Sequence, residues 1–245
     1  MNAVSAIREH IDIVFNALVG IPNDPDSLMH FAIRRGDAWR FKKALARGAN
    51  PEARDGAGCT ALESAVQYKC PEMVKELLAR KANHKGGRYT SIGSFFGANL
   101  TVPLVDAAMA GSMEMVKLLV EAGADINARG HDGWTALHLA AVNSNRELAG
   151  YLLAQGADPN VRDDQGNIPL YYVFQGKCNR EVALALLDAK AYVPDESTPV
   201  LCTRAKACGW HDIAEAIDHR NVTGVEQGLT TKRNIPVRKP FVFKH

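Results

Sequence analysis

Apolar and polar positions follow a pattern that repeats about every 33 residues along this chain. Each period contains an alanine-rich stretch, a polar turn and a second stretch that carries a pair of leucines. After Thr135, the residues Leu137, Leu139 and Ala140 form the apolar side of a short helix that the Thr135 side chain can cap. The leucine pairs mark a second helix and occur at 77–78, 118–119, 152–153 and 186–187. The pattern therefore predicts helix pairs, which bury their apolar faces by stacking on their neighbours.

The ends of the second helices are marked by GAN at 48–50, KAN at 81–83, GAD at 123–125, GAD at 156–158 and KAY at 190–192. Their spacings are 33, 42, 33 and 34 residues. Glycine at the first position suits the left-handed conformation in which many helices end. Because Lys81 and Lys190 replace this glycine, we expect their turns to differ in geometry. Val102 and Ile168 replace the capping threonine, so we expect those helix starts to be weaker by about 1 kcal/mol each.

The segments TALHLA at 135–140, GADPN at 156–160, VPLVDAA at 102–108 and GADIN at 123–127 resemble the ankyrin repeat, of the type found in stand-alone microbial ankyrin proteins. The resemblance implies an all-α fold, an ankyrin-repeat solenoid of helix-turn-helix units with β-hairpin-like fingers. It also implies that His138, and similarly His30, braces the turn between neighbouring repeats. About six repeats are expected, at 27–58, 59–101, 102–133, 134–166, 167–197 and 198–220.

The N-terminal segment 1–26 is expected to hold a capping helix and a linker. Its apolar stripe consists of Val4, Ile7, Ile11, Val14 and Leu18, which predicts a helix that covers the exposed end of the first repeat. A helix that binds a membrane surface or a partner has the same pattern. Charged residues interrupt this stripe, so we expect neither a secretory signal nor a membrane span, and we expect a cytoplasmic protein.

The spacing of 42 residues places an inserted loop, at about 84–100, in the finger between the second and third repeats. An insertion at a finger tip leaves a stack of helices intact. The loop contains four glycines together with Arg88, Tyr89, Phe95 and Phe96. Its aromatic residues either fold back over the neighbouring repeats or project as an arm into a partner, and the sequence leaves both alternatives open.

Charge is unevenly distributed over this chain of net charge +2. The C-terminal tail, 221–245, has five basic residues and one acidic residue, and the first repeat has seven basic and three acidic residues. A basic end can attract an acidic surface of a partner protein. The basic residues of the tail are widely spaced, which is a weak signal for nucleic acid or anionic lipid, and we expect neither as a partner.

Catalytic and metal-binding motifs are not evident. The sequence contains no H-E-x-x-H, no G-x-S-x-G and no Cys/His set with zinc spacing. The five cysteines form no C-x-x-C motif and are expected to be small buried hydrophobes; they are Cys59, Cys70, Cys178, Cys202 and Cys208. We therefore expect no catalytic residue, no metal, no cofactor and no small-molecule substrate.

The resemblance implies a concave side formed by the fingers and the first helices, where residues outside the core can recognise a partner. The finger candidates are Ala57, His131, Asp132, Trp134, Asp164, Gln165 and Asn167. The first-helix candidates are Arg34, Arg35, Gln67, Tyr68, Met109, Val142, Asn143, Phe174 and Gln175. Tyr68, Met109 and Trp134 have side chains that are favoured as interface anchors, although Trp134 can instead pack on the adjacent finger.

These observations predict a non-enzymatic protein-protein interaction module, an adaptor or inhibitor that binds through the concave face, the fingers and the inserted loop. An immunity-type toxin inhibitor is one subtype. The alternatives are a host-directed effector adaptor and a binder of nucleic acid or an anionic surface that uses the basic first repeat and the tail. We expect a monomer in the absence of the partner, whose identity the sequence does not reveal.

Overall fold

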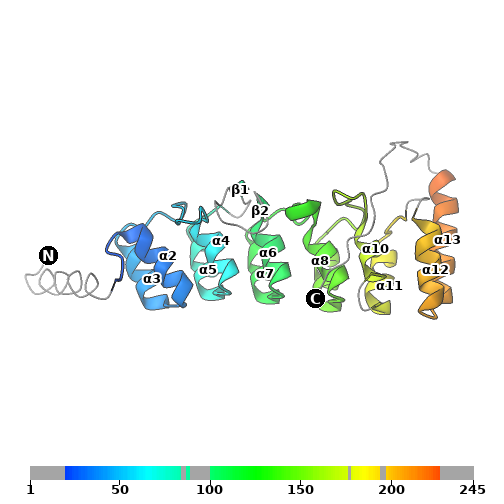
Figure 1. The fold of residues 1–245 in the computed structure, drawn as a ribbon, viewed down its shortest axis with the longest axis horizontal. Coiled ribbons are helices and arrows are strands. Elements are labelled where there is room, and N and C mark those ends of the chain that lie inside the picture. The colour runs from blue at the N-terminus through cyan, green and yellow to red at the C-terminus, as the bar shows by residue number, and fades with distance from the viewer. Residues whose placement is uncertain (1–19, 84–86, 89–99, 176–177, 194–196, 227–245) are drawn as a thin grey trace, which may run out of the picture. The chain divides into compact units, whose positions relative to one another are not determined.

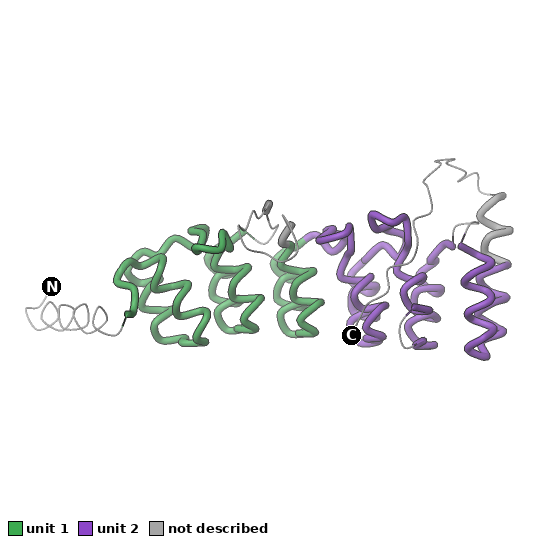
Figure 2. The backbone as a smooth tube through the Cα atoms, in the orientation of Figure 1, with its two compact units in different colours: residues 1–124 green, residues 125–245 purple. Residues whose placement is uncertain are grey.

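The computed structural model describes residues 20–83, 87–88, 100–175, 178–193 and 197–226. Within these ranges the chain forms twelve α-helices, one 3-10 helix and two strands of two residues each. The chain divides into two compact units, residues 1–124 and 125–245 (Figure 2). The fold is all-α and consists of consecutive helix pairs, as the repeating pattern predicts.

Unit 1 contains three helix pairs in chain order (Figure 1). They are α2 (Pro25–Arg35) with α3 (Ala38–Ala46), α4 (Ala61–Gln67) with α5 (Pro71–Ala79), and α6 (Pro103–Met109) with α7 (Met113–Glu121). The first helices α2, α4 and α6 pack against one another in this order, and so do the second helices α3, α5 and α7. One leucine from each predicted pair, Leu77 and Leu119, is fully buried in the core that results.

Unit 2 begins with the 3-10 helix η1 (His131–Gly133), which is followed by three helix pairs. They are α8 (Ala136–Val142) with α9 (Arg146–Ala154), α10 (Pro169–Val173) with α11 (Arg180–Asp188), and α12 (Thr198–Ala207) with α13 (His211–Glu226). The first helices α8 and α10 pack together, as do the second helices α9, α11 and α13. Leu152 and Leu186, again from the leucine pairs, are fully buried.

The outermost described helices extend beyond the expected repeat boundaries. Helix α2 begins at Pro25 because the Asp24 carboxylate accepts the N–H of Ser27 at 2.8 Å and proline fits the first helical turn. Helix α13 continues to Glu226, past the expected boundary at residue 220. The predicted capping helix at 3–18 and the tail from residue 227 lie outside the described residues.

The predicted differences between helix starts are present. Thr60 and Thr135 close capping boxes, in which the threonine side chain and the residue three positions later each satisfy a backbone N–H of the other. Val102 and Ile168 make no side-chain hydrogen bond at the corresponding positions. In both cases a proline follows in the first turn, and proline has no N–H that would need a partner there.

The expectation that Lys81 and Lys190 change the turn geometry is wrong. Their φ angles are 60° and 64°, in the same left-handed region as Gly123 at 87° and Gly156 at 90°. At Lys190 the helix ends with the hydrogen bonds Lys190 N–H to Leu187 O and Ala191 N–H to Leu186 O, both at 2.9 Å. Gly156 and the residue after it form the equivalent pair. These bonds satisfy the last carbonyls of the helix, and they hold lysine in a conformation that it rarely adopts.

The insertion begins and ends at a short hairpin. Strand β1 (Gly87–Arg88) pairs antiparallel with β2 (Leu100–Thr101), with Gly87 opposite Thr101 and Arg88 opposite Leu100. The hairpin lies between α5 and α6 in the chain, so the added residues do not interrupt a helix pair. Tyr89, Phe95 and Phe96 lie outside the described residues, and only the backbone of Arg88 is described.

The expectation of five buried cysteines is correct only for Cys59. All five are free thiols, but Cys70, Cys178, Cys202 and Cys208 are partly exposed. Cys70 and Cys208 stand at helix termini, as the N-cap of α5 and the C-cap of α12, where the chain lies near the surface. Position at a terminus, and not the apolar character of the thiol, sets their exposure.

Candidate protein-binding surface

The C-terminal ends of the first helices in unit 1 carry five of the predicted partner-binding residues. All five are exposed, and we call them the unit 1 row: Arg34, Arg35, Gln67, Tyr68 and Met109. Because α2 packs against α4 and α4 against α6, they belong to neighbouring helices (Figure 1). Tyr68 exposes 46% of its surface and Met109 exposes 64%. The unit 1 row thus combines two large side chains suited to interface anchoring with two guanidinium groups.

The position of the row follows from the way each first helix is buried. In α4 the residues 61–66 are buried, and exposure begins at Gln67 and Tyr68, where the helix ends. In α6 the same change occurs at Met109, after the buried Ala107 and Ala108. Neighbouring helices cover the middle of each first helix, so side chains become exposed only where the helix ends.

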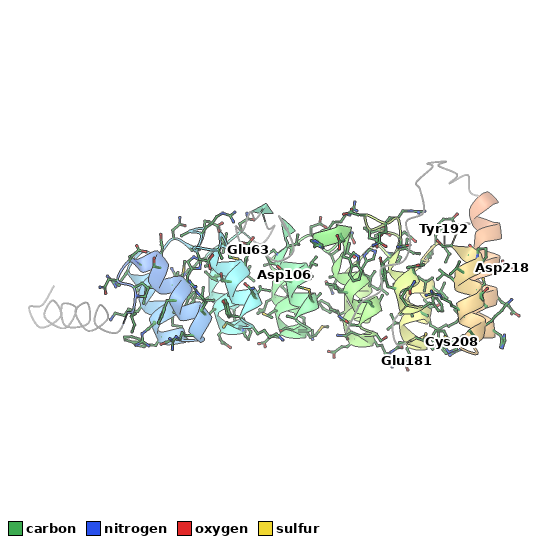
Figure 3. All side chains as sticks on the ribbon, viewed as in Figure 1. Glu63, Asp106, Glu181, Tyr192, Cys208 and Asp218 are labelled. Carbon is green, nitrogen blue, oxygen red and sulfur yellow. The ribbon has the colours of Figure 1, made fainter. Side chains whose placement is uncertain are left out.

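Two acidic residues on the same first helices are not among the sequence-based candidates (Figure 3). Glu63 on α4 is buried, and its carboxylate accepts the N–H of Thr60 at 2.8 Å. Asp106 on α6 is half-buried; burial, and secondly the negative charge of Glu63, raise its pKa to about 6. The sequence signal was an acidic residue inside the apolar stretch PLVDAAM. This part of unit 1 therefore changes its charge close to neutral pH.

The fingers of unit 2, residues 130–135 and 162–167, carry the exposed candidates His131, Asp132, Asp164 and Gln165. The two fingers are tied together, because the Arg129 guanidinium donates to Asp164 Oδ1 at 2.8 Å and the Asp164 N–H donates to the Asp132 carbonyl at 2.9 Å. Gly133 lies at this contact with a φ of 74°, and a Cβ there would come within 2.6 Å of Asp164 Oδ1. The fingers therefore present their exposed side chains on a fixed backbone.

Trp134 packs on its neighbours within unit 2. Its ring centroid lies 4.7 Å from that of Tyr172 and 6.3 Å from that of His138. The Tyr172 hydroxyl donates a hydrogen bond to Asp163, and burial raises the pKa of Tyr172. Trp134 therefore packs on residues of its own unit, as in the second of the two alternatives given for it, and its side chain remains half-exposed.

His138 braces the neighbouring finger, as expected from the family resemblance. Its Nδ1 accepts the N–H of Thr135 at 3.1 Å, and its Nε2 donates to the Asn167 carbonyl at 3.2 Å. Burial lowers the pKa of His138, which keeps the ring in the neutral form that this pair of bonds requires. Asn167 also donates its N–H to Asp163 at 2.8 Å, so this candidate is engaged in the structure of the finger.

The remaining candidates divide between surface and core. Ala57, Asn143 and Gln175 are exposed, and Val142 is half-buried. Phe174 is buried, with its ring 5.8 Å from that of Trp210, so its selection as a binding residue was wrong. Helix α10 has only five residues, and Phe174 follows it directly as the C-cap, in contact with the next helix pair of unit 2.

Trp39 is an exposed aromatic residue that is not among the sequence-based candidates. It lies on α3, a second helix, and exposes 65% of its surface. The Lys43 ammonium group sits 4.9 Å from the centre of its ring. The signal was a tryptophan in the polar context DAWRFKK. Its helix differs from the first helices that carry the unit 1 row.

The described residues contain no group of three or more His, Cys, Asp or Glu side chains arranged to hold a metal ion. None of the described helices is long and apolar enough to cross a bilayer.

Comparison with known families matches residues 57–85 to an ankyrin repeat and residues 104–197 to three copies of ankyrin repeats. Mitochondrial disaggregase from Homo sapiens is 45% identical over 71 residues, which are 29% of this chain and 10% of that protein. Protein phosphatase 1 regulatory subunit 27 from Mus musculus is 44% identical over 66 residues, 27% of this chain and 43% of that protein.

A longer match joins this chain to L-asparaginase from Dirofilaria immitis, which is 34% identical over 142 residues, 58% of this chain and 22% of that protein. In all three relatives the matched segment is less than half of the protein's length. The similarity therefore concerns a repeat segment that occurs in proteins with very different names.

Proposed function

This chain belongs to the ankyrin-repeat family, and from that membership we propose that it is a protein-protein interaction module without enzymatic activity. The module binds a protein partner through the ends of its first helices and through its fingers. It acts in the cytoplasm and is a monomer before the partner binds.

The observation that carries this proposal is the exposure of Tyr68 and Met109 on neighbouring first helices of unit 1. Both side chains expose apolar surface to water. A partner that covers them removes this surface from water, which contributes favourably to the free energy of binding. Gln67 precedes Tyr68 on α4, and Arg35 ends the neighbouring helix α2; both supply polar contacts. The exposed finger residues of unit 2 are a separate candidate contact region.

Within this class we propose a regulatory role, either as an inhibitor or as an adaptor. One relative is named a regulatory subunit of protein phosphatase 1, so a similar repeat segment occurs in a protein that is named for regulating an enzyme. An immunity-type toxin inhibitor is a special case of the inhibitor role, and a host-directed effector is a special case of the adaptor role. The two roles differ in whether the partner loses its activity on binding.

The test begins with capture of the partner from a lysate of the native cells on the immobilised full chain, followed by mass spectrometry. Binding of the purified partner is then measured by calorimetry for the wild type and for Tyr68→Ala and Met109→Ala. We expect each substitution to weaken binding by about tenfold or more, as for central anchors of an interface. An assay of the partner's own activity, with and without the chain, distinguishes inhibitor from adaptor.

Trp39→Ala is the matched control, because Trp39 is as exposed as Met109 but lies on a second helix. It should leave the affinity unchanged. Equal losses for Trp39→Ala and Tyr68→Ala would argue against the proposed surface. Capture of nucleic acid with an affinity that collapses between low and moderate salt would favour the nucleic-acid alternative instead.

A further inference from the structure

Unit 1 contains a pocket of about 580 Å³ beside the basic end of the unit 1 row. Its wall includes His30, Phe31, Arg34 and Arg35 from α2, and Arg54 and Asp55 from the loop that follows α3. A volume of this size is within the range of sites that bind small groups. Arg34 and Arg35 belong both to the pocket and to the unit 1 row, so the two features are continuous.

The carboxylates around the pocket are already engaged by the backbone. Asp24 accepts a backbone N–H at 2.8 Å and caps α2, and Asp26 accepts one at 2.7 Å from residue 50. Asp55 accepts two, at 2.9 and 3.0 Å, and closes the turn between residues 55 and 59. These three groups hold the pocket in shape and are poorly placed to neutralise the arginines across it.

Two of the three arginines keep their donors available. Arg54 donates to the Gly58 carbonyl at 2.6 Å and lies 3.9 Å from the Glu63 carboxylate. Within the described part of the chain, by contrast, neither Arg34 nor Arg35 has a carboxylate within ion-pair distance. The Arg35 guanidinium lies over the Phe31 ring, 5.2 Å from its centre. That contact uses the face of the guanidinium and leaves the N–H groups at its edge free to bind an anion.

His30 supports the buried side of the pocket wall. His30 is only 2% exposed, and its Nε2 lies 3.0 Å from the Ala53 carbonyl. A carbonyl oxygen can only accept, so Nε2 carries a proton and donates to it. In the described structure the Nδ1 of His30 is buried without a hydrogen-bond partner. His30 therefore supports the pocket wall through its bond to Ala53, and its Nδ1 is shielded from any ligand in the pocket.

We propose that this pocket binds one acidic residue, Asp or Glu, of the partner protein. The carboxylate pairs with Arg34 and Arg35. This inference rests on the proposed function, which supplies a protein as the partner. Only two of the three arginines of the wall have available donors, so the pocket suits a single carboxylate better than a polyanion.

The direct test does not require the partner. The isotope-labelled full chain is titrated with N-acetylglutamate N-methylamide while the N–H resonances of the arginine guanidinium groups are followed by NMR. We expect saturable shifts of the Arg34 and Arg35 signals in the millimolar range, as for a fragment that makes one charged contact. The neutral isostere, N-acetylglutamine N-methylamide, should cause no saturable shift.

Three variants complete the test. Arg34→Gln and Arg35→Gln should each weaken fragment binding by about tenfold, as for loss of a hydrogen bond to a charged group. Lys42→Gln removes the same charge from an exposed position of α3 and should leave binding unchanged. Circular dichroism checks that all three variants fold, which the exposure of the substituted residues favours.

The proposal is overturned by the absence of saturable shifts, by equal binding of the glutamine analogue, or by inorganic phosphate binding more tightly than the glutamate analogue. These outcomes leave the proposed function standing, because partner capture and the Tyr68 and Met109 variants test that separately. A captured partner whose affinity is insensitive to Arg34→Gln and Arg35→Gln would likewise overturn the pocket alone.

Discussion

The third residue of α8, α4 and α6 shows how one position serves different purposes in different repeats. His138 and Glu63 both accept the backbone N–H of the capping threonine, but only His138 has a further donor that reaches the next finger. Val105 occupies the same position without any hydrogen-bonding group and is buried. His30 is the sixth residue of α2 because that helix begins earlier; it bonds to the Ala53 carbonyl, but α2 is capped by Asp24, and its Nδ1 has no hydrogen-bond partner in the described structure. Side-chain chemistry at this position therefore decides how tightly a finger is held.

Asp106 gives a prediction at this scale. Its pKa in the folded chain is about 6, above the value of about 4 for an unfolded aspartate, so the folded state holds a proton that the unfolded state releases. Raising the pH through this window therefore lowers the free energy of unfolding. Asp106→Asn removes that loss, and urea unfolding near pH 7 should show a gain of about 1–2 kcal/mol.

Asp37→Asn is the control with the opposite sign. A hydrogen bond from the Arg40 N–H is the main cause that lowers the pKa of Asp37, so its charged form favours folding and this contribution is lost as the pH falls. Asparagine is also a good N-cap, so this substitution mainly removes the charge. The Asp106 prediction is contradicted if Asp106→Asn lowers the free energy of unfolding at neutral pH, because the ionised Asp106 carboxylate would then not destabilise the folded state.

At the scale of elements, the ends of the helices are more uniform than their sequences. Gly156 and Lys190 both end a second helix in the left-handed region, and both helices close with the same two hydrogen bonds. The starts differ more, because Thr135 closes a capping box whereas Ile168 makes no side-chain hydrogen bond. Hydrogen bonds to the last carbonyls and burial of the following alanine, Ala157 or Ala191, impose the same turn on either residue.

Lys190→Gly should therefore stabilise the chain. Glycine adopts a positive φ without the steric cost that lysine bears, although it also gives the unfolded chain more freedom. The net gain should be about 0.5–1 kcal/mol, measured from the midpoint of urea unfolding. The reciprocal change, Gly156→Lys, should lower the midpoint, since a Cβ there meets no atom and only the backbone conformation is at stake. Destabilisation by Lys190→Gly would contradict this account.

For the whole molecule, the hairpin base of the insertion makes a clean experiment possible. Arg88 and Leu100 face each other across β1 and β2, so a two-residue Asn-Gly turn can join them in place of residues 89–99. Because the helix pairs on both sides are complete, we expect the helical content to be retained and the melting temperature to change by only a few degrees. Circular dichroism with thermal melting measures both.

The same variant separates the two alternatives for the insertion. Loss of partner binding with unchanged melting would support an aromatic arm that contacts the partner. A large fall in melting temperature with binding retained would instead indicate that the loop packs over the neighbouring repeats. If the variant with the Asn-Gly turn has the melting temperature and the partner affinity of the wild type, both alternatives are contradicted.

Residue periodicity was sufficient to predict the helix pairs, the capping threonines and the place of the insertion, because each depends on local spacing and on backbone conformation. It was not sufficient for residues whose neighbours are distant in sequence. Phe174 was expected at a binding surface and is buried against Trp210, whereas Trp39 was overlooked and is exposed. Four cysteines were expected in the core and lie partly at the surface.

By itself, then, the sequence determined that this protein is a series of ankyrin helix pairs, since a period of about 33 residues with apolar stretches of helical length allows few other folds. The tertiary structure decided which side chains remain at the surface and which charges remain unpaired. Tyr68 and Met109 are exposed, and Asp106 retains a raised pKa, because burial and electrostatics depend on the helices packed alongside. The pocket between α2 and the loop after α3 exists for the same reason: its wall comes from segments that only the packed chain brings together.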